Sequence, residues 1–538
     1  AALYASLAIR IPLISIFIGA IILYAPYTHA INGVFGGDAF NYLFKTYSLL
    51  HGHDPFAADP RKGPFFSLLL IPALFIPDPL LWSRWVGIIA AAATAALVPL
   101  VTRKIGTPWP IAVMAGVLTA ENSFLIFESA DALAVTTFTF LLLLSVYCYL
   151  AMKKSQKWIW ALAVSSGLAM LTRFEGGIVA AVLLPAAWIR YRISWKKIVW
   201  PIGLAVLIMA LPLSSFLFSG KSGIRTPQDI SNDDGLFLVH SIHDEQLALN
   251  IQRSYEFFTN VWVEKGDTMQ IAFWVGMGIV IGCIVILLKH FLSHIAPRIL
   301  LSLGIITSLG FLFLLAMNNE INRAILVASL YILVGIGIAL FIRKKPIDGI
   351  AIACMLLAEI MIVIWILPKD RYFLFTVPFL YLFLVYAIHT LVPAKKKIAQ
   401  FFAVFMMCIA AVFFFQANQH YLQKKVEAYN NNAQETDVLL KALIDLRASN
   451  AHVGALDDEG LAVTIYIKKQ NLFIFNQTDI STADQELQFI RDNHIQYIME
   501  RDTAPQWKIA RSHPELFSPA KIYTTKNGDA KVVVYQVK

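Results

Sequence analysis

Residues 81–104 read LWSRWVGIIAAAATAALVPLVTRK. The first 22 positions, 81–102, are almost entirely apolar, and their one charged residue, Arg84, stands near the start. A helix needs about 20 apolar residues to cross the hydrocarbon core of a bilayer. Lysine and arginine gather at the cytoplasmic ends of such helices. Arg103 and Lys104 therefore predict that this transmembrane helix ends in the cytoplasm.

Similar apolar stretches recur along the first 420 residues. We predict 13 transmembrane helices, at about 9–27, 81–102, 109–127, 132–152, 158–172, 176–190, 198–218, 269–288, 299–317, 324–342, 349–367, 373–392 and 398–418. A shorter apolar run at 64–77 contains Pro72 and is too short to cross, so we expect it to lie at the membrane interface. The expected fold is an α-helical polytopic membrane protein.

The composition of the whole chain agrees with this fold class. Of the 538 residues, 58% are hydrophobic and 15% are charged, whereas about a quarter of the residues in soluble proteins are charged. The formal net charge is +9, but residues 421–538 are close to neutral. The basic excess thus belongs to the membrane part, where it orients helices, and we expect no nucleic-acid partner.

Basic residues follow alternate predicted helices and so give the topology. They occupy the loops at 103–107, 153–157, 190–197, 289–298, 343–348 and 395–397, in which Asp348 is the only acid. With these loops in the cytoplasm, the outer side receives the loops 28–80 and 220–268 and the C-terminal tail. The first apolar run, behind Arg10, is predicted to be a retained anchor in the plasma (inner) membrane.

The sequence predicts two parts, a membrane module at 1–420 and an extracytoplasmic domain at 421–538. In the second part, apolar residues recur at helical spacing over 434–449 and 485–493. Alternating or β-branched runs at 472–475 and 531–537 predict strands. We expect a small α/β domain.

The first outer loop contains the most informative residues. Asp38 stands just beyond the first predicted helix, and the basic pair Arg61–Lys62 ends the loop. A carboxylate at this place could accept the proton of an incoming hydroxyl, and the two cations could hold an anionic leaving group without a metal. The alternative is that Asp38 caps the helical segment that follows it.

Four motifs in this order resemble those of the GT-C glycosyltransferases, in particular the bacterial and archaeal relatives of protein O-mannosyltransferases and of the lipid A aminoarabinose transferase. The motifs are Gly-Asp-(x3)-Tyr with Gly-x-Asp-Pro-Phe and Arg-Lys-x-Pro in the first loop, Glu128 to Leu133, Gly167 to Gly176, and Asp370 to Leu374. The resemblance covers roughly residues 9–395, and the tail is similar only as a soluble outer domain.

The resemblance implies an inverting transfer of a sugar from a polyprenyl-phosphate donor to an acceptor at the outer face. It implies a general base at Asp38 and donor phosphate or sugar contacts at Tyr42, Arg61, Lys62, Arg173, Arg371 and Tyr372. Glu128 and Asp131, with Glu175 nearby, match a second acidic site. In metal-using relatives this site helps to bind a divalent cation, so Asp38, Glu128 and Asp131 are candidate ligands of Mg or Mn, if a metal is used at all.

Two departures from the family pattern stand in the first loop. Close relatives often have adjacent acids, but Asp38 is followed by Ala39, which weakens the case for a metal there. Relatives also often have Lys-Pro-Pro, where this chain has Lys62-Gly63-Pro64. A glycine at that position loosens the backbone beside Lys62.

Structural alternatives remain open for the other candidates. Arg173 and Glu175 could form a simple salt bridge, Arg371 and Tyr372 could anchor a helix at the interface, and Asp131 could cap a helix. Glu359 stands inside a predicted span, where an acid is costly, and the sequence gives it no role. Two groups of histidines lack the tight spacing of zinc sites. They are His51 and His53 with Asp54, and His240 and His243 with Asp244 and Glu245.

We therefore expect a glycosyltransferase that acts on a hydroxyl of a glycan, lipid or protein. An oligosaccharyltransferase is the first alternative, although the tail lacks a Trp-Trp-Asp motif and contains only Trp507. The second alternative, a flippase or transporter of lipid-linked sugars, would place charges along a central pathway. Here the charges gather at the outer ends of the predicted helices.

Overall fold

A computed structural model describes residues 2–31, 38–51, 63–76, 78–218, 320–366, 370–391, 422–428, 453–456, 473–475, 483–492, 494–501, 513–524 and 531–538. It also describes one or two residues at a time between 252 and 258, between 404 and 419 and between 430 and 445, and residue 510. The chain forms two compact units. One comprises residues 1–25, 87–129 and 134–423, and the other comprises residues 26–86, 130–133 and 424–538.

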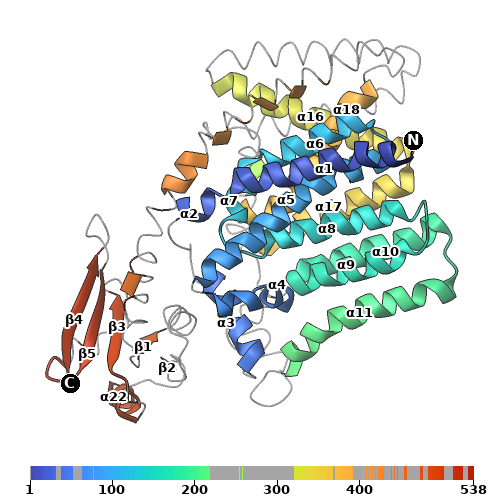
Figure 1. Cartoon of the computed structure of the whole chain (residues 1–538). Coiled ribbons are helices and arrows are strands. Elements are labelled where there is room, and N and C mark those ends of the chain that lie inside the picture. The colour runs from blue at the N-terminus through green and yellow to red at the C-terminus, as the bar shows by residue number, and fades with distance from the viewer. Residues whose placement is uncertain are drawn as a thin grey trace. The chain divides into compact units, whose positions relative to one another are not determined.

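Helices make up most of the described chain (Figure 1). They are α1 (Ala2–Tyr24), α2 (Tyr27–Ala30), α3 (Asp38–His51), α4 (Pro64–Leu69), η1 (Ile71–Phe75), α5 (Pro79–Ile105), α6 (Trp109–Ala120), α7 (Ser123–Ser129), α8 (Val135–Ala151), α9 (Trp158–Thr172), η2 (Phe174–Gly176), α10 (Gly177–Tyr191), α11 (Trp195–Phe218), α16 (Glu320–Lys344), α17 (Pro346–Ile366), η3 (Asp370–Thr376), α18 (Val377–Leu391) and α22 (Ala483–Asp492).

The chain is a multi-pass membrane protein. Within the described residues, five helices are long and apolar enough to cross a membrane, and the bent pair α6–α7 would make a sixth. The predicted spans at 269–288 and 299–317 lie outside the described residues, and the span at 398–418 is described only at single positions. The number of 13 spans therefore stays a prediction.

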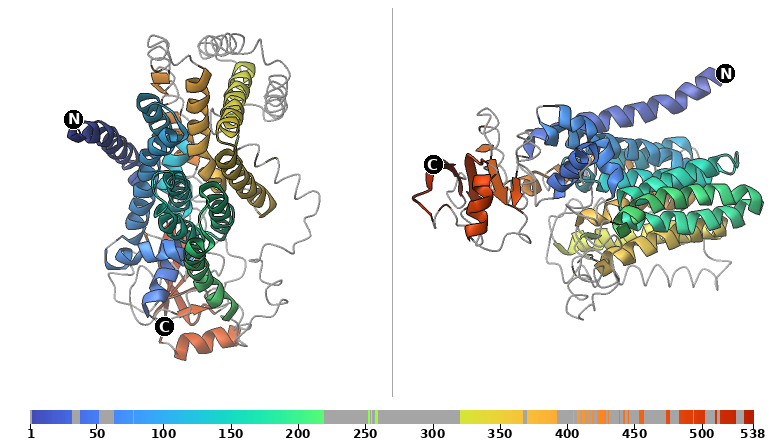
Figure 2. Two further views of the ribbon diagram at one scale, coloured as in Figure 1. Left: turned by 90° about the vertical axis from the view of Figure 1, so that its right-hand side faces the viewer. Right: turned by 90° about the horizontal axis from the view of Figure 1, so that it is seen from below.

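The helices of the first unit pack side by side. Helix α9 lies between α8, α10 and α11, and α18 contacts both α6 and α16 (Figures 1 and 2). Glycines allow the closest approaches: a Cβ added to Gly337 on α16 would lie 2.2 Å from the carbonyl oxygen of Phe383 on α18. Small residues at helix contacts are typical of membrane bundles, where van der Waals packing replaces the hydrophobic effect.

One predicted span, 109–127, is bent in the structure. Helices α6 and α7 meet at an angle of 55°, because Asn122 begins a new helix by accepting the N–H of Leu125 on its side-chain oxygen at 3.2 Å. The carbonyl groups freed by the break find partners: the Tyr24 hydroxyl donates to Ala120 at 2.8 Å, and the Asn418 amide donates to Glu121 at 3.1 Å. A break inside a membrane protein is tolerated when its backbone groups are satisfied in this way.

The apolar run at 64–77 forms two short helices, α4 and η1, of which neither is long enough to cross a bilayer. This agrees with the prediction that the run does not span. The side chains of Phe75 and Leu68 are exposed.

The C-terminal segment contains a five-stranded sheet in the order β2-β1-β3-β5-β4. Its strands are β1 (Val453–Leu456), β2 (Phe473–Phe475), β3 (Tyr497–Arg501), β4 (Phe517–Thr524) and β5 (Lys531–Val537). Strand β1 is parallel to β2 and β3, whereas β5 is antiparallel to β3 and β4. The predicted strands at 472–475 and 531–537 and the helix at 485–493 are confirmed as β2, β5 and α22, while β1, β3 and β4 were not predicted.

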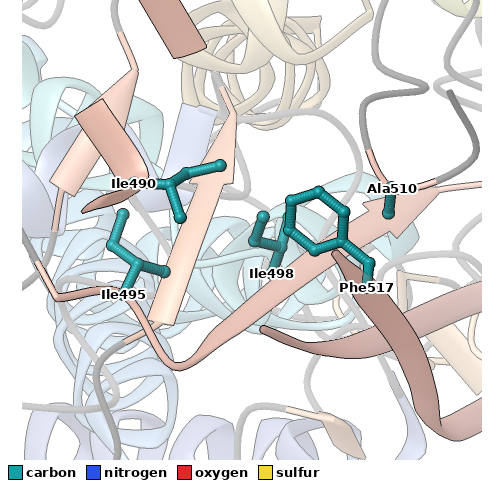
Figure 3. Close-up of a cluster of buried hydrophobic side chains, with 5 residues drawn as sticks. All are labelled: Ile490, Ile495, Ile498, Ala510 and Phe517. Atoms are coloured by element: carbon teal, nitrogen blue, oxygen red, sulfur yellow. The ribbon is translucent and has the colours of Figure 1, made fainter. Parts of the chain in front are cut away.

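Helix α22 and the sheet share a small core. Ile490 on α22, Ile495, Ile498 on β3, Ala510 and Phe517 on β4 form a buried cluster (Figure 3). At about 25 cal/mol for each Å² of apolar surface, such burial stabilises the packing of the helix on the strands.

Candidate functional site

The best-described candidate site begins at the turn between α9 and α10. Helix α9 ends at Thr172, and Arg173 adopts an extended backbone (φ −148°, ψ 135°) before η2. Gly176 makes the turn possible, because a Cβ there would lie 2.5 Å from the carbonyl carbon of Ala169. Arg173 donates from Nη2 to Oε1 of Glu175 at 2.6 Å, and each side chain is only 14% exposed.

Tyr372 joins Arg173 to a second arginine. The Cζ atom of Arg173 lies 4.3 Å from the ring centroid of Tyr372, and that of Arg371 lies 5.4 Å from the same centroid. A guanidinium within about 6 Å of an aromatic centroid is attracted by the ring quadrupole. The structure thus brings together four of the predicted site residues, including the Glu175 partner of Arg173.

Aromatic packing holds η3, which carries Arg371 and Tyr372. Phe373 is buried and stacks on Phe257 with ring centroids 5.3 Å apart. Phe375 packs edge-to-face on Phe138 of α8, with centroids 6.3 Å apart. Because residues 373–376 of η3 are all buried, and Phe373 and Phe375 pack on different neighbours, the backbone that presents Arg371 and Tyr372 is fixed in place.

Glu359 adds a second carboxylate to this cluster. Its side chain on α17 is fully buried, and neither carboxylate oxygen has a hydrogen-bond partner among the described residues. Glu359 interacts electrostatically with Arg173 and Glu175. The sequence identified Glu359 as an unexplained acid, and the structure places it within electrostatic range of the candidate site.

The arginine cluster lies far from the basic loops. Helix α9 has 15 residues and is therefore about 22 Å long, with Lys157 before its first residue and Arg173 after its last. Arginine presents its N–H donors as a planar fork that matches the oxygens of a phosphate or carboxylate. Two arginines on one aromatic ring can therefore bind a phosphorylated ligand at this end of the bundle.

Asp38 is the first residue of α3, so a helical segment follows it, as predicted. Its side chain is not among the described parts of the chain, and neither are Arg61 and Lys62. Tyr42, one helical turn further along α3, is buried and packs edge-to-face on Phe66, with centroids 5.0 Å apart. The structure gives Tyr42 a packing contact, and its predicted contact with a donor stays a prediction.

Lys45, also on α3, is a buried cation that was not among the predicted site residues. It is only 1% exposed, although lysine is almost never fully buried unless it is paired. Tyr42 and Lys45 are three residues apart on α3, so they share one face of this helix. The signal was present in the sequence as a lysine on the apolar stripe of a short amphipathic helix.

The predicted second acidic site, Glu128 with Asp131, is buried, but the two residues do not lie on one helix. Glu128 and Asp131 are each 4% exposed. Helix α7 ends at Ser129, so Glu128 lies within this helix and Asp131 lies beyond its end. The N-cap residue of α8 is Ala134 rather than Asp131. No group of three or more metal-ligating side chains occurs within the part of the chain that is described, and the predicted histidine groups lie outside it, apart from the backbone of His51.

No protein-family model and no curated protein matches this sequence. Among solved structures, the chain is similar over nearly its full length to the apo oligosaccharyltransferase of Archaeoglobus fulgidus, with a TM-score of 0.48, 13% identity, and coverage of 90% of this chain and 69% of that one.

It is also similar to apo ArnT from Cupriavidus metallidurans, with a TM-score of 0.44, 13% identity and 97% of both chains covered. A third similar structure is the protein O-mannosyltransferase Pmt1–Pmt2 complex of S. cerevisiae bound to the sugar donor. Its TM-score is 0.32 and its identity 16%, over 40% of this chain and 34% of that one.

Proposed function

We propose that this chain is a membrane glycosyltransferase. It transfers a sugar from a polyprenyl-phosphate donor to a hydroxyl group of a glycan, lipid or protein at the outer face of the plasma membrane, and it inverts the anomeric centre. The observation that carries the proposal is the pair of arginines, Arg173 and Arg371, on the ring of Tyr372 at the end of α9 opposite the basic loops.

The arginine pair suits the phosphate of such a donor. A phosphate is a good leaving group once its charge is neutralised, so the reaction needs positive charge and one base rather than a strong general acid. In the proposed reaction the oxygen of the acceptor hydroxyl attacks the anomeric carbon, and Asp38 takes the proton of that hydroxyl. The bond from that carbon to the phosphate oxygen breaks, and the carrier phosphate leaves with the electron pair.

The remaining predicted residues have supporting parts in this proposal. Arg61 and Lys62, with Tyr42, contact the donor from the first outer loop. Glu128 and Asp131 provide the second acidic site, at which Mg or Mn would stabilise the leaving phosphate if a metal is used. The sequence resemblance supports these roles, and charged groups at helix ends are tolerated where they face a wet cavity.

The direct test is Asp38→Asn in the purified full chain. Loss of a general base lowers the rate by about 10²- to 10⁴-fold, so we expect transfer to fall by that factor while the affinity for polyprenyl phosphate is unchanged. Asp78→Asn is the matched control, because Asp78 accepts the N–H groups of Leu80 and Leu81 at the start of α5 and an asparagine can do the same.

Unchanged transfer by Asp38→Asn would contradict the proposed base. If that variant also moved lipid-linked sugar across vesicles at the wild-type rate, the chain would be a transporter rather than a transferase.

A further inference from the structure

The opposite end of the helix bundle carries a second concentration of charge, which the proposed function does not use. Six of the cations at that end interact with one another: Lys104 at the end of α5, Lys153 and Lys154 after α8, Arg190 at the end of α10, and Lys344 and Lys345 at the junction of α16 and α17. Lys154 acts electrostatically on Lys104, while Lys153, Arg190 and Lys344 act on Lys345. We call these residues the basic cluster.

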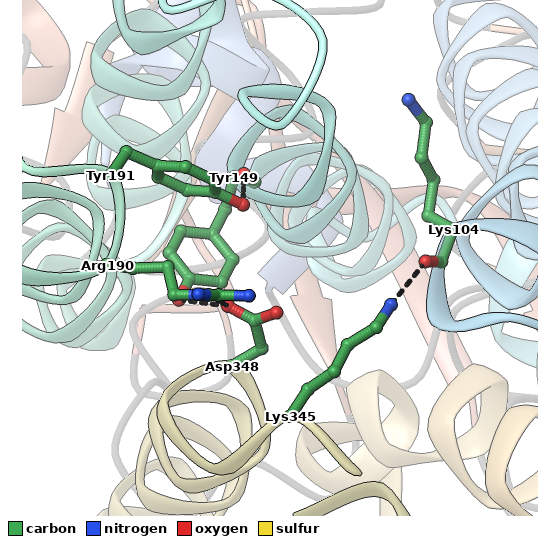
Figure 4. Close-up of polar contacts among 6 residues, drawn as sticks. All are labelled: Lys104, Tyr149, Arg190, Tyr191, Lys345 and Asp348. Carbon is green, nitrogen blue, oxygen red and sulfur yellow. Dashed lines mark hydrogen bonds and ion pairs between the residues drawn. The ribbon is translucent and has the colours of Figure 1, made fainter.

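Asp348 is the acid among these basic loops, and its carboxylate already has partners within the protein. Its Oδ1 accepts the Tyr149 hydroxyl at 2.9 Å and Nε of Arg190 at 3.1 Å (Figure 4). The Tyr191 hydroxyl donates to the carbonyl of Tyr149 at 3.0 Å. Asp348 therefore joins α8, α10 and α17 and neutralises one cation of the six.

Three lysines of the basic cluster, Lys104, Lys344 and Lys345, have contacts with neighbouring groups. Lys345 donates from Nζ to the carbonyl of Lys104 at 2.9 Å, and the side chain of Lys104 points away from that contact (Figure 4). Nζ of Lys104 lies 5.5 Å from the ring centroid of Tyr147, and that of Lys344 lies 5.9 Å from the centroid of Tyr386. Burial and the neighbouring cations lower the pKa of Lys345, and Asp348 opposes this shift.

No carboxylate forms an ion pair with Lys104, Lys153 or Lys344 among the residues that the structure describes. The orientation of helices requires only basic residues in loops. It does not require an ammonium group that hydrogen-bonds to the end of another helix, as in Lys345, or ammonium groups that lie over aromatic rings, as in Lys104 and Lys344. This arrangement leaves positive charge for an external anion.

The surroundings of the cluster favour a lipid as the source of that anion. Trp158, Trp188 and Trp195 are exposed at the same end of α9, α10 and α11, and tryptophan is enriched where helices meet lipid headgroups. Basic pockets between helices at the cytoplasmic side bind anionic headgroups. We propose that the basic cluster binds the phosphate headgroup of an anionic phospholipid, such as phosphatidylglycerol.

The proposal is tested by native mass spectrometry of the purified full chain with phosphatidylglycerol and with phosphatidylcholine. In Lys104→Gln/Lys345→Gln, we expect the affinity for phosphatidylglycerol to fall about tenfold or more, because two charged donors to the phosphate are lost. The control Lys196→Gln/Lys197→Gln removes two exposed lysines at the start of α11 and should change that affinity less than about twofold.

Several results would overturn the proposal. They are equal affinities of the wild type for the two lipids, unchanged phosphatidylglycerol binding by Lys104→Gln/Lys345→Gln, and an equal loss in the control pair, which would indicate only general surface charge. Displacement of the lipid by millimolar inorganic phosphate would show a site for a free anion instead. Because no sugar donor is present, these outcomes are independent of the proposed transferase activity.

Discussion

Arg371 and Arg173 share one aromatic ring, and the chemistry of arginine decides what this pair can do. A guanidinium stacks flat on a ring and still offers N–H groups in its plane, whereas an ammonium is a point charge. The ring of Tyr372 therefore brings both arginines together through cation–π contacts.

This geometry predicts the effect of Arg371→Lys. The charge is kept but the fork and the stacking are lost, so we expect KM for the donor to rise about tenfold with kcat nearly unchanged. Steady-state kinetics with varied donor measure this. Arg343→Lys, an exposed position at the other end of the bundle, is the control. A fall in kcat at constant KM would contradict a role in donor binding.

Glu359 is the least expected residue of the site. A buried polar group without a partner costs about 1–3 kcal/mol, so replacing the carboxylate of Glu359 by the thioether of methionine removes that cost. We expect Glu359→Met to raise the melting temperature in detergent and to lower transfer, because Arg173 loses the carboxyl group that interacts with it. Leu357→Met, on the exposed face of α17, should change neither. A lower melting temperature for Glu359→Met would mean that the carboxylate is stabilised in the fold.

At the scale of elements, the turn from α9 to α10 controls the site. A Cβ on Gly176 would meet backbone atoms of Ala169 and Met170 within 2.7 Å, whereas a Cβ on Gly177 would meet only the flexible Met170 side chain, with its sulfur nearest at 3.3 Å. The two neighbouring glycines therefore form a matched pair.

We expect Gly176→Ala to destabilise the protein by about 1–3 kcal/mol through overpacking and to weaken donor binding by displacing Arg173. Gly177→Ala should be tolerated, because the side chain of Met170 can move. Thermal unfolding in detergent and donor binding measure both effects. Equal melting temperatures and equal donor affinities of the two variants would contradict the role of the close approach at Gly176.

Strand β4 offers a test by pH. Lys521 and Tyr523 on β4 donate hydrogen bonds to Oδ2 of Asp445, and these bonds hold the pKa of Asp445 below its usual value. A lowered pKa in the folded state stabilises the fold above the unfolded-state pKa of about 3.9, and this contribution is lost as the pH falls through the lowered value.

Asp445→Asn should therefore reduce the hydrogen-exchange protection of β4 relative to the wild type at pH 5–7, and the difference should shrink below about pH 4. The effect is small because the pair is exposed. A difference between the two proteins that grows on acidification would contradict this assignment.

At the scale of the whole molecule, apolar length and basic loops predicted most helices well. The predicted span at 81–102 matches α5, which is long and apolar enough to cross a membrane, whereas the predicted span at 158–172 is a helix, α9, of only 15 residues. The bend between α6 and α7 was not predicted. The new helix begins at Asn122, and the freed carbonyls are satisfied by Tyr24 and Asn418, which are distant in sequence.

The candidate site was predicted in part. Arg173, Glu175, Arg371 and Tyr372 were each selected by motif, but their meeting around one ring depends on how η3 packs between α8 and Phe257, which no local pattern contains. Lys45 and Glu359 were missed or left without a role, because a single charge in an apolar stretch gains meaning only from its neighbours in space.

The central claim is that a lipid-borne phosphate binds at the arginine end of the bundle. A structure of the full chain with polyprenyl phosphate bound tests it most directly. We predict phosphate oxygens within hydrogen-bonding distance, about 3 Å, of the guanidinium groups of Arg173 and Arg371. A phosphate bound instead among Lys104, Lys344 and Lys345, with the arginine pair empty, would contradict the account.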